Sequence, residues 1–384
     1  MHTLIQRERL ATTFIELCEI DSPSRQEGRI AAYLRRVFTA LGADSIVEDH
    51  SAAATGSESG NLIIRFNATL PEVEGVFFSC HMDTVEPGEG VTVDRSGDIF
   101  TSRGATILGG DDKSGIAALI EMMTVLRENA LGHGLIEIVI TTCEEIGLCG
   151  AKHLEHRLVQ AKYGYALDTN GIDRVIIGAP AANKFKIEIT GVAAHAGLNP
   201  EDGVSAIQVA AQAISRAPAG RIDEETTANF GLVKGGVATN IVPEKVVVEG
   251  EVRSHNQEKL NRYTAEIEAA FTRTAATWTN DWAANTHRPR IAIDMMAEYP
   301  AMRLALDAPV IARIREAGQR LGRKLDFVVA GGGSDANIFN SFGLATAIVA
   351  TGMDKVHTTD EQLHLDDLVS VTELILGVAA PPRP

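Results

Sequence analysis

Residues 76–83, with the sequence VFFSCHMD, carry an apolar run directly into a histidine and an aspartate. The run at 76–80 predicts a buried strand. Because side chains along a strand repeat every two residues, the imidazole of His81 and the carboxylate of Asp83 are expected on the same side. A His-x-Asp pattern is common and, alone, is more often structural than functional, so its meaning depends on the rest of the chain.

Three more apolar runs lead into polar residues of the same kind. Strands are predicted at 136–142, 163–167 and 344–350. Glu144 and Glu145 follow the first strand, Asp168 ends the second, and His357 lies seven residues beyond the third. Ligands of open α/β sheets gather at the carboxyl ends of the strands. The alternation of strands and helices predicts an α/β fold, a mixed sheet flanked by helices, with a site at this edge.

The middle of the chain has a different pattern. Apolar and charged residues alternate at 185–189, which indicates a strand with one face in water. A helix at about 207–214, two strands, a second helix and a strand near 290–295 follow, and this β-α-β-β-α-β order is ferredoxin-like. We therefore expect an inserted domain at 181–298 between the two segments of a catalytic domain, 1–180 and 299–384.

Two helices are predicted at the N-terminus. The second would bury a face that includes Ile30, Leu34 and Phe38. Ser24 and Glu27, just before it, have the spacing of a capping box, in which each side chain accepts a hydrogen bond from the other residue's backbone. Ser24 and Glu27 are therefore expected to cap this helix.

Two acidic motifs have both a structural and a functional interpretation. The loop at 109–115, GGDDKSG, predicts a helix cap through Asp111 or Asp112, but one of these carboxylates could instead bridge two cations. Glu144 and Glu145 could be two solvated side chains. At the end of a strongly apolar strand, however, one could bind metal and the other could act as a general base.

The candidate ligands are histidines and carboxylates, a combination that suits zinc, with cobalt or manganese as alternatives. The net charge of −16 argues against nucleic acid as a partner. No apolar stretch approaches the ~20 residues of a membrane span. The four cysteines contain no Cys-x-x-Cys pair, which favours a cytoplasmic protein. The GGGSD sequence at 331–335 lacks the lysine of a phosphate-binding P-loop.

Taken together, these motifs resemble the dizinc exopeptidases and deacylases, a family that includes peptidase T, aminoacylase, acetylornithine deacetylase and the glutamate carboxypeptidases. The matching runs span nearly the whole chain in the family's order: 79–85, 108–115, 142–147, 165–168, 191–197, 238–243 and 331–336, with His357. The runs at 145–148 and 223–229 look most like the peptidase T-like branch. The resemblance implies a zinc exopeptidase-like fold with a lid and dimerisation domain inserted in it.

The resemblance also implies a role for each matching residue. His81 and Asp168 would hold one Zn²⁺ and Glu145 and His357 a second, with Asp111 as the bridge between them. Asp83 would orient His81, and Glu144 would be the general base. In the inserted domain, the resemblance implies that His195, Asn240 and Arg253 bind substrate. His195 would do so in the active site of a partner subunit, and Arg253 by holding a terminal carboxylate.

The function implied is that of a metal-dependent aminopeptidase that hydrolyses tripeptides or other short peptides by attack of a metal-activated water. A homodimer through the lid domain is expected from the resemblance alone. An N-acyl amino acid deacylase or a carboxypeptidase would use the same machinery and is the close alternative. A non-catalytic metal- or peptide-binding module is opposed by the presence of Glu144 beside a full ligand set. A serine hydrolase built on Ser334 and Asp335 is opposed by the absence of a Gly-x-Ser-x-Gly elbow.

Overall fold

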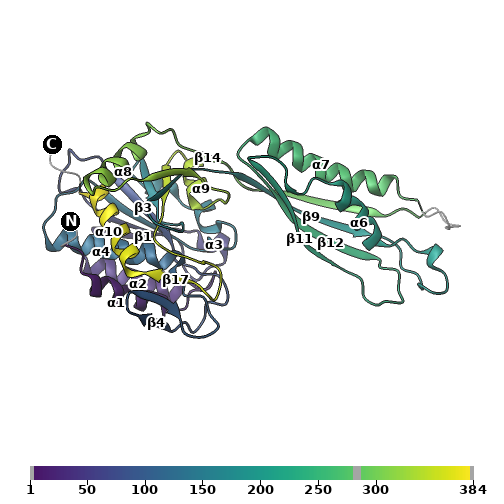
Figure 1. The fold of residues 1–384 in the computed structure, drawn as a ribbon, viewed down its shortest axis with the longest axis horizontal. Coiled ribbons are helices and arrows are strands. Elements are labelled where there is room, and N and C mark those ends of the chain that lie inside the picture. Colours follow the sequence, from purple (N-terminus) through teal and green to yellow (C-terminus); the bar gives the residue numbers. More distant parts are fainter. Residues whose placement is uncertain (1–3, 280–286, 381–384) are drawn as a thin grey trace. The chain divides into compact units, whose positions relative to one another are not determined.

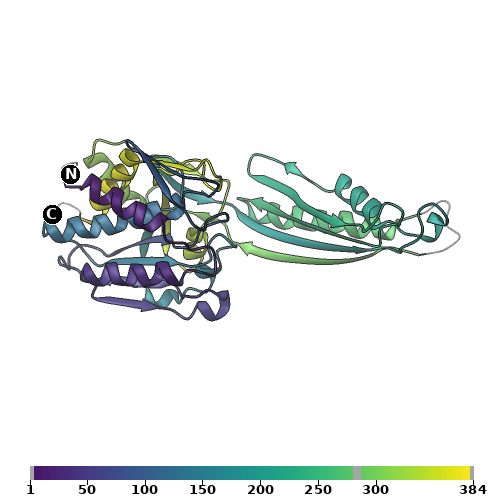
Figure 2. The ribbon, with the colours of Figure 1, turned by 90° about the horizontal axis from the view of Figure 1, so that it is seen from below.

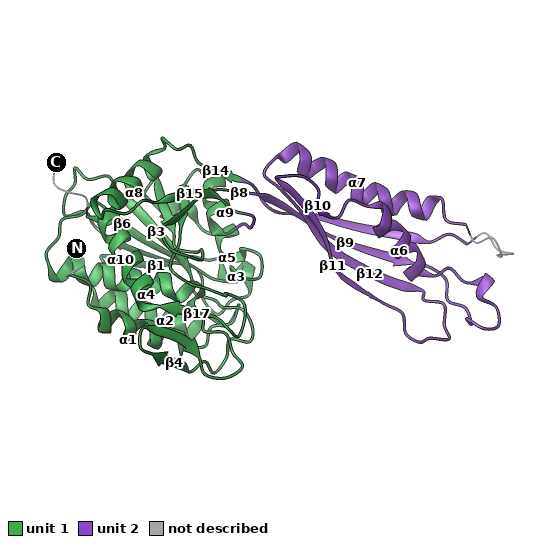
Figure 3. Cartoon of the chain, viewed as in Figure 1, with its two compact units in different colours: residues 1–178, 302–330, 334–384 green, residues 179–301, 331–333 purple. Residues whose placement is uncertain are grey.

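The strand predicted at 76–80 is β3 (Val76–His81), and it lies near the middle of a nine-stranded sheet. The computed structural model describes residues 4–279 and 287–380. The chain packs into two compact units (Figure 3). Unit 1 contains residues 1–178, 302–330 and 334–384, and unit 2 contains residues 179–301 and 331–333. The inserted domain expected at 181–298 falls within unit 2.

Unit 1 holds the nine-stranded mixed sheet (Figure 1). Its strands are β1 (Ser45–Glu48), β2 (Leu62–Phe66), β3, β6 (Ile136–Thr141), β7 (Tyr163–Ala166), β8 (Arg174–Ala179), β14 (Met302–Arg303), β15 (Asp326–Val329) and β16 (Ala345–Val349). The order is β1-β2-β6-β3-β7-β16-β8-β14, and β15 pairs with β8. The four strands predicted from the sequence, β6, β3, β7 and β16, are neighbours and run parallel to one another.

Helices cover both faces of this sheet. They are α1 (Arg7–Cys18), α2 (Gly28–Ala40), α3 (Ala52–Thr55), α4 (Gly110–Glu128), α5 (Cys149–Lys152), α8 (Pro309–Arg320), α9 (Asp335–Ser341) and α10 (Leu365–Ala379), with a 3₁₀ turn at His156–Leu158. A second sheet in unit 1 has three strands, β4 (Val93–Ser96), β5 (Ile99–Ser102) and β17 (Gln362–His364).

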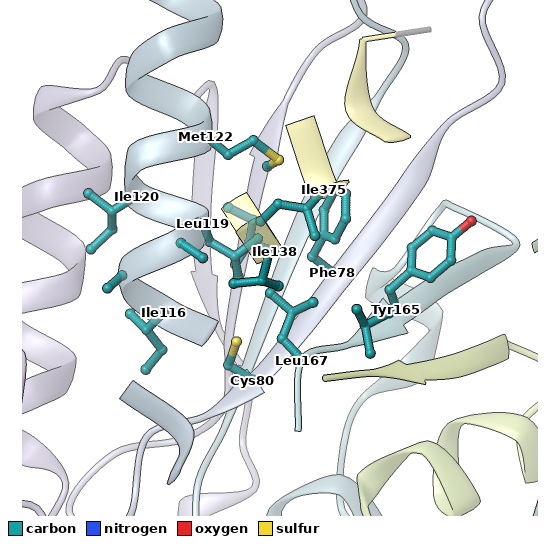
Figure 4. Packing of buried hydrophobic residues seen from close by; sticks show 14 of the residues in the cluster. Phe78, Cys80, Ile116, Leu119, Ile120, Met122, Ile138, Tyr165, Leu167 and Ile375 are labelled. Carbon is teal, nitrogen blue, oxygen red and sulfur yellow. The ribbon is translucent and has the colours of Figure 1, made fainter. Parts of the chain in front are cut away.

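All side chains of β3 are buried, so both faces of the sheet must be covered at this strand. Phe78 and Cys80 point into the main core, where Leu119 of α4 packs with Ile138 and Leu167 (Figure 4). Helices α1, α2, α8 and α10 contribute to the same core, and Figure 2 shows α1 and α2 in purple. Phe77 points the other way and makes an edge-to-face contact with Phe339 of α9, with the ring centroids 5.8 Å apart. The predicted mixed sheet flanked by helices is confirmed.

Unit 2 has the predicted ferredoxin-like order. Its elements are β9 (Ala181–Thr190), a 3₁₀ turn at Pro200–Asp202, α6 (Ala206–Arg216), β10 (Gly220–Arg221), β11 (Thr226–Gly235), β12 (Lys245–Ser254), α7 (Gln257–Ala276) and β13 (Arg290–Tyr299). The antiparallel sheet has the order β10-β11-β12-β9-β13, and α6 and α7 contact each other over it. Alternate residues of β9 such as Phe185 and Ile187 are buried beneath these helices, as the alternating pattern predicted.

Within residues 4–279 and 287–380, no helix combines the length and the apolar character that crossing a bilayer requires.

Candidate metal centre

The parallel strands bring the predicted ligands to one edge of the main sheet. His81 is the last residue of β3, Glu144 and Glu145 follow β6, and Asp168 follows β7. Adjacent parallel strands end at the same edge, so the sheet order alone places these groups together. Asp111 enters from the first turn of α4, and His357 from the loop between β16 and β17.

The carboxylate of Asp111 lies between the two imidazoles. Its Oδ1 is 3.0 Å from His81 Nε2, and its Oδ2 is 3.2 Å from His357 Nε2. His357 Nε2 is also 3.2 Å from Glu145 Oε1. Ligand atoms of His81, Asp111 and Glu145 all lie within 4.8 Å of one another, a spacing that could hold a metal ion. Each oxygen of Asp111 thus faces a different histidine, as a carboxylate shared by two cations would.

His81 is held by the backbone of Asp83 more closely than by its carboxylate. His81 Nδ1 is 2.9 Å from the Asp83 carbonyl oxygen but 3.6 Å from Asp83 Oδ1. A proton on Nδ1 that donates to this carbonyl leaves the lone pair of Nε2 directed at Asp111 and available to a cation. The Asp83 carboxylate instead accepts hydrogen bonds from Glu144 N at 2.9 Å and Glu145 N at 3.3 Å. Asp83 therefore fixes both the imidazole and the loop that carries the paired glutamates.

Several carboxyl groups lie close together at this edge of the sheet, and their proximity changes their pKa values. Burial raises the pKa of Glu144 well above its ordinary value, and the nearby charges of Asp168, Asp335 and Glu145 add to this effect against the opposing effect of His81. Burial and the charge of Asp111 likewise raise the pKa of Asp168. A carboxyl group with a raised pKa accepts a proton more readily near neutral pH, which suits a general base.

The neighbouring carboxylates raise the pKa values of both imidazoles, His81 and His357. Contacts with Asp111 and then with Glu145 raise the pKa of His357 to about 10. In Asp111 burial favours the neutral acid, but His357 and His81 outweigh it and hold the pKa below its usual range. Glu145 Oε1 is buried, and among the described residues its contact is with His357 Nε2 at 3.2 Å, which lacks the geometry of a hydrogen bond. Acids that are buried or partly buried and repel one another, two imidazoles and a carboxylate oxygen without a hydrogen-bond donor form a donor set that fits divalent cations.

Unit 2 does not bring its three candidate residues together. His195 forms an isolated β-bridge with Ile241, and Ala196 N donates to the carbonyl of Asn240 at 3.0 Å, so His195 and Asn240 are close neighbours. Both are exposed, and both lie past the end of the sheet where Thr190 pairs with Lys245.

Arg253 lies at the opposite end of the same sheet, where it pairs with Ala182. Ala182 and Thr190 are eight positions apart along β9, which corresponds to ~26 Å at about 3.3 Å per residue. Arg253 donates from Nε to Glu251 Oε1 at 2.8 Å and from Nη2 to Glu251 Oε2 at 3.0 Å. Its Nη1 faces Gly332, where a Cβ would lie 3.6 Å away. His195 and Arg253 of one chain are therefore too far apart to contact one short peptide.

The predicted capping box before α2 is wrong. Helix α2 has Glu27 as its N-cap and no side-chain cap. Ser24 Oγ instead donates to Asp83 Oδ2 at 2.6 Å, and Glu27 Oε1 accepts a hydrogen bond from Cys143 N at 3.0 Å. Both side chains thus support the segments that carry the candidate site, Ser24 through Asp83 and Glu27 through the residue before Glu144.

Ser334 and Glu361 both have hydrogen-bond partners that indicate structural roles. Ser334 caps α9, and its reciprocal partner is Asn337, so this serine has the role of a helix cap and the serine-hydrolase alternative is not supported. Glu361, in the loop of His357, is buried and accepts hydrogen bonds from the backbone of the Asp111 loop. No local pattern at 357–361 distinguishes this glutamate from a surface residue, because its partners are some 250 positions away.

Comparison with known proteins gives a consistent result. The peptidase dimerisation domain matches residues 177–279, and peptidase family M28 matches residues 61–198. The structure is similar to that of the aminopeptidase PepT from Bacillus cereus, with 39% identity, coverage of 98% of this chain and 99% of that chain, and a TM-score of 0.88.

Two other relatives agree with this match. A tripeptidase from Staphylococcus aureus is 36% identical, with 98% of each chain covered and a TM-score of 0.91. Peptidase T from Limosilactobacillus fermentum is 27% identical over 73% of this chain and 67% of its own length.

Proposed function

Because the chain belongs to the peptidase T-like branch of the M20 metallopeptidases, we propose that it is an aminopeptidase that hydrolyses tripeptides with two metal ions. The observation that carries the proposal is the position of Asp111, with one carboxylate oxygen 3.0 Å from His81 Nε2 and the other 3.2 Å from His357 Nε2. In this arrangement His81 and Asp168 would hold one cation, Glu145 and His357 the other, and Asp111 would bridge them.

Zinc is the metal that this mixture of imidazole and carboxylate suits best, with cobalt and manganese as alternatives. When bound, the pair would activate the attacking water and polarise the scissile carbonyl group. Glu144 takes up the proton of that water on its carboxylate and later gives it to the amine of the leaving peptide. Asp83 keeps Glu144 and Glu145 in position through the hydrogen bonds to their backbone.

Substrate would be bound by Asn240, Arg253 and His195. Arg253 Nη1 takes no part in the pair with Glu251 and would donate to the terminal carboxylate of the peptide. Arg253 pairs with Ala182, and His195 lies beyond Thr190, ~26 Å further along β9. This separation supports a role for His195 in the site of a partner subunit, where it would stabilise the oxyanion of the tetrahedral intermediate. A cytoplasmic location is proposed because all four cysteines, at positions 18, 80, 143 and 149, are free.

The function is tested by product analysis on matched substrates. We expect release of the N-terminal residue from tripeptides, little turnover of N-acetyl amino acids, and a cation content near two per chain by elemental analysis. Prolonged chelation should abolish the activity, and added Zn²⁺, Co²⁺ or Mn²⁺ should restore it. Cleavage of N-acylated substrates alone would instead establish the deacylase alternative, and activity that survives complete removal of metal would exclude the proposed site.

The homodimer is proposed to form through an open sheet edge in unit 2. β11 pairs along its length with β12, but on its other side, within the described part of the chain, only Thr227 and Ala228 pair, with β10. Residues 229–235 therefore present an edge that a second copy can extend. Val233 on this edge is 54% exposed and Val237 just beyond it is 86% exposed. Ile207 of α6 reaches the same region, 3.5 Å from where a Cβ on Gly236 would lie.

We expect Val233→Lys to shift the protein from dimer to monomer, because a lysine on an edge strand opposes strand pairing between copies. The measurement is molar mass by light scattering during size-exclusion chromatography. The matched control is Val329→Lys, since Val329 is 58% exposed on β15, whose described pairing is with β8 alone. A Val233→Lys protein with the mass of a dimer would mean that this edge is not the interface.

A further inference from the structure

Glu361 connects the two loops that carry Asp111 and His357. It lies four residues after His357 and is 1% exposed. Its Oε2 accepts hydrogen bonds from Leu108 N at 2.8 Å and Gly109 N at 2.9 Å, and its Oε1 accepts one from Asp111 N at 3.2 Å. A single buried carboxylate thus binds the backbone of one ligand loop from the other.

The backbone before α4 needs such an acceptor. Although α4 begins at Gly110, Asp111 has φ −83° and ψ 105°, which is not helical, and Gly109 has φ +80°. N–H groups at the start of a helix have no acceptor within the helix, and buried ones require a partner from elsewhere. Glu361 supplies it on both sides of Gly110, and in doing so fixes the direction in which the Asp111 side chain leaves the main chain.

By holding these two loops together, Glu361 also affects the distance between the proposed metal ligands Asp111 and His357. Asp111 Oδ2 is 3.2 Å from His357 Nε2. The side chain of His357 is half-exposed, and its backbone has a left-handed φ of +62°. Glu361 anchors this loop on one side and the Asp111 loop on the other. The distance between the two ligands therefore depends on a residue that would touch neither cation.

We propose that Glu361 is a positioning residue that sets Asp111 and His357 at the spacing required to share a metal ion, an inference that rests on the proposed function. Outer residues that orient metal ligands typically change metal affinity by about 10–100-fold when they are replaced. A change of this size is expected for the cation on the Glu145 and His357 side.

A matched control separates positioning from ordinary stabilisation. Glu137 is also a fully buried glutamate of unit 1 that accepts hydrogen bonds from two backbone N–H groups, Gln160 at 2.7 Å and Ala161 at 2.8 Å. It also accepts hydrogen bonds from Arg65, and none of its hydrogen bonds to described residues involves a candidate ligand. Glu137→Gln and Glu361→Gln both place an amide where a carboxylate receives N–H donors.

The experiment titrates metal-free full-length protein with Zn²⁺ against a chromophoric chelator, well below the temperature of unfolding. The expected result for Glu361→Gln is one cation bound about 10–100-fold more weakly, with kcat partly restored by excess Zn²⁺. Glu137→Gln should lower Tm and leave both affinities unchanged. Glu361→Asp, which keeps the charge but shortens the reach, should give an intermediate loss of affinity and covers the case in which Glu361→Gln does not fold.

Two outcomes overturn the inference. Wild-type affinity for both cations in a Glu361 variant, whatever its Tm, would reduce Glu361 to a structural role, and so would an equal loss of affinity in Glu137→Gln. A wild-type protein that binds no pair of cations would instead contradict the proposed function, so the two failures can be told apart.

Discussion

A Glu144→Gln enzyme is expected to keep its metal ions and to lose about 10²–10⁴-fold in kcat, the range that a general base contributes. Glutamine preserves the shape of the side chain but cannot take up a proton from water. The backbone N–H of Glu144 donates to Asp83 Oδ1, and this hydrogen bond does not depend on the side chain, so the loop should stay in place. The measurements are steady-state kinetics on a tripeptide and elemental analysis of the purified variant.

Glu145→Gln is the paired variant that tests the division of roles. Glu145 lies against His357 and belongs to the cluster with His81 and Asp111, so its loss should lower metal content as well as rate. Glu144 lies next to it in sequence but is absent from that cluster. If Glu144→Gln retained full turnover, or if it lost its metal while Glu145→Gln kept it, the assignment of base and ligand would have to be reversed or abandoned.

The second large effect is expected at Asp111. An Asp111→Asn protein should bind neither cation tightly, because the replaced group faces both His81 and His357 and would be a ligand to both ions. Activity should fall below that of any variant in which only one cation is weakened. Metal content after gel filtration and the Zn²⁺ dependence of the residual rate are the measurements.

Asp112→Asn is the control for Asp111, since it changes the neighbouring residue in the same way. Asp112 is fully buried, and burial raises its pKa well above the ordinary value, which favours a neutral acid that asparagine resembles. Its Oδ2 accepts a hydrogen bond from His81 N at 3.2 Å, and an amide oxygen can do the same. Loss of both cations in Asp112→Asn with retention in Asp111→Asn would mean that the bridge was assigned to the wrong residue.

The sequence was most informative where strand order determined the outcome. Apolar runs at 76–80, 136–142, 163–167 and 344–350 were recognisable because each is short, apolar and followed by polar residues. They became the neighbouring strands β3, β6, β7 and β16, so His81, Glu145 and Asp168 had to emerge at one edge. Two-residue strands such as β14 carry too little pattern to be predicted.

Sequence reasoning failed where a side chain had a choice of partners. Ser24 and Glu27 have capping-box spacing, yet their hydrogen bonds go to Asp83 and Cys143, which local spacing cannot reveal. The same holds for Glu361, whose acceptor role depends on a loop far away in sequence. His195 and Arg253 could be named only through the resemblance, and their separation along β9 became visible only from the strand register.

The separation of His195 from Arg253 along β9 makes the catalytic activity depend on protein concentration. If the imidazole that completes a site comes from a neighbouring chain, the working enzyme exists only while two chains are associated, and its specific activity becomes a binding curve in protein concentration. Dilution below the dissociation constant of the dimer would inactivate an otherwise well-folded molecule. An exposed loop on an inserted domain would then decide whether catalysis occurs at all, although it holds neither metal nor base.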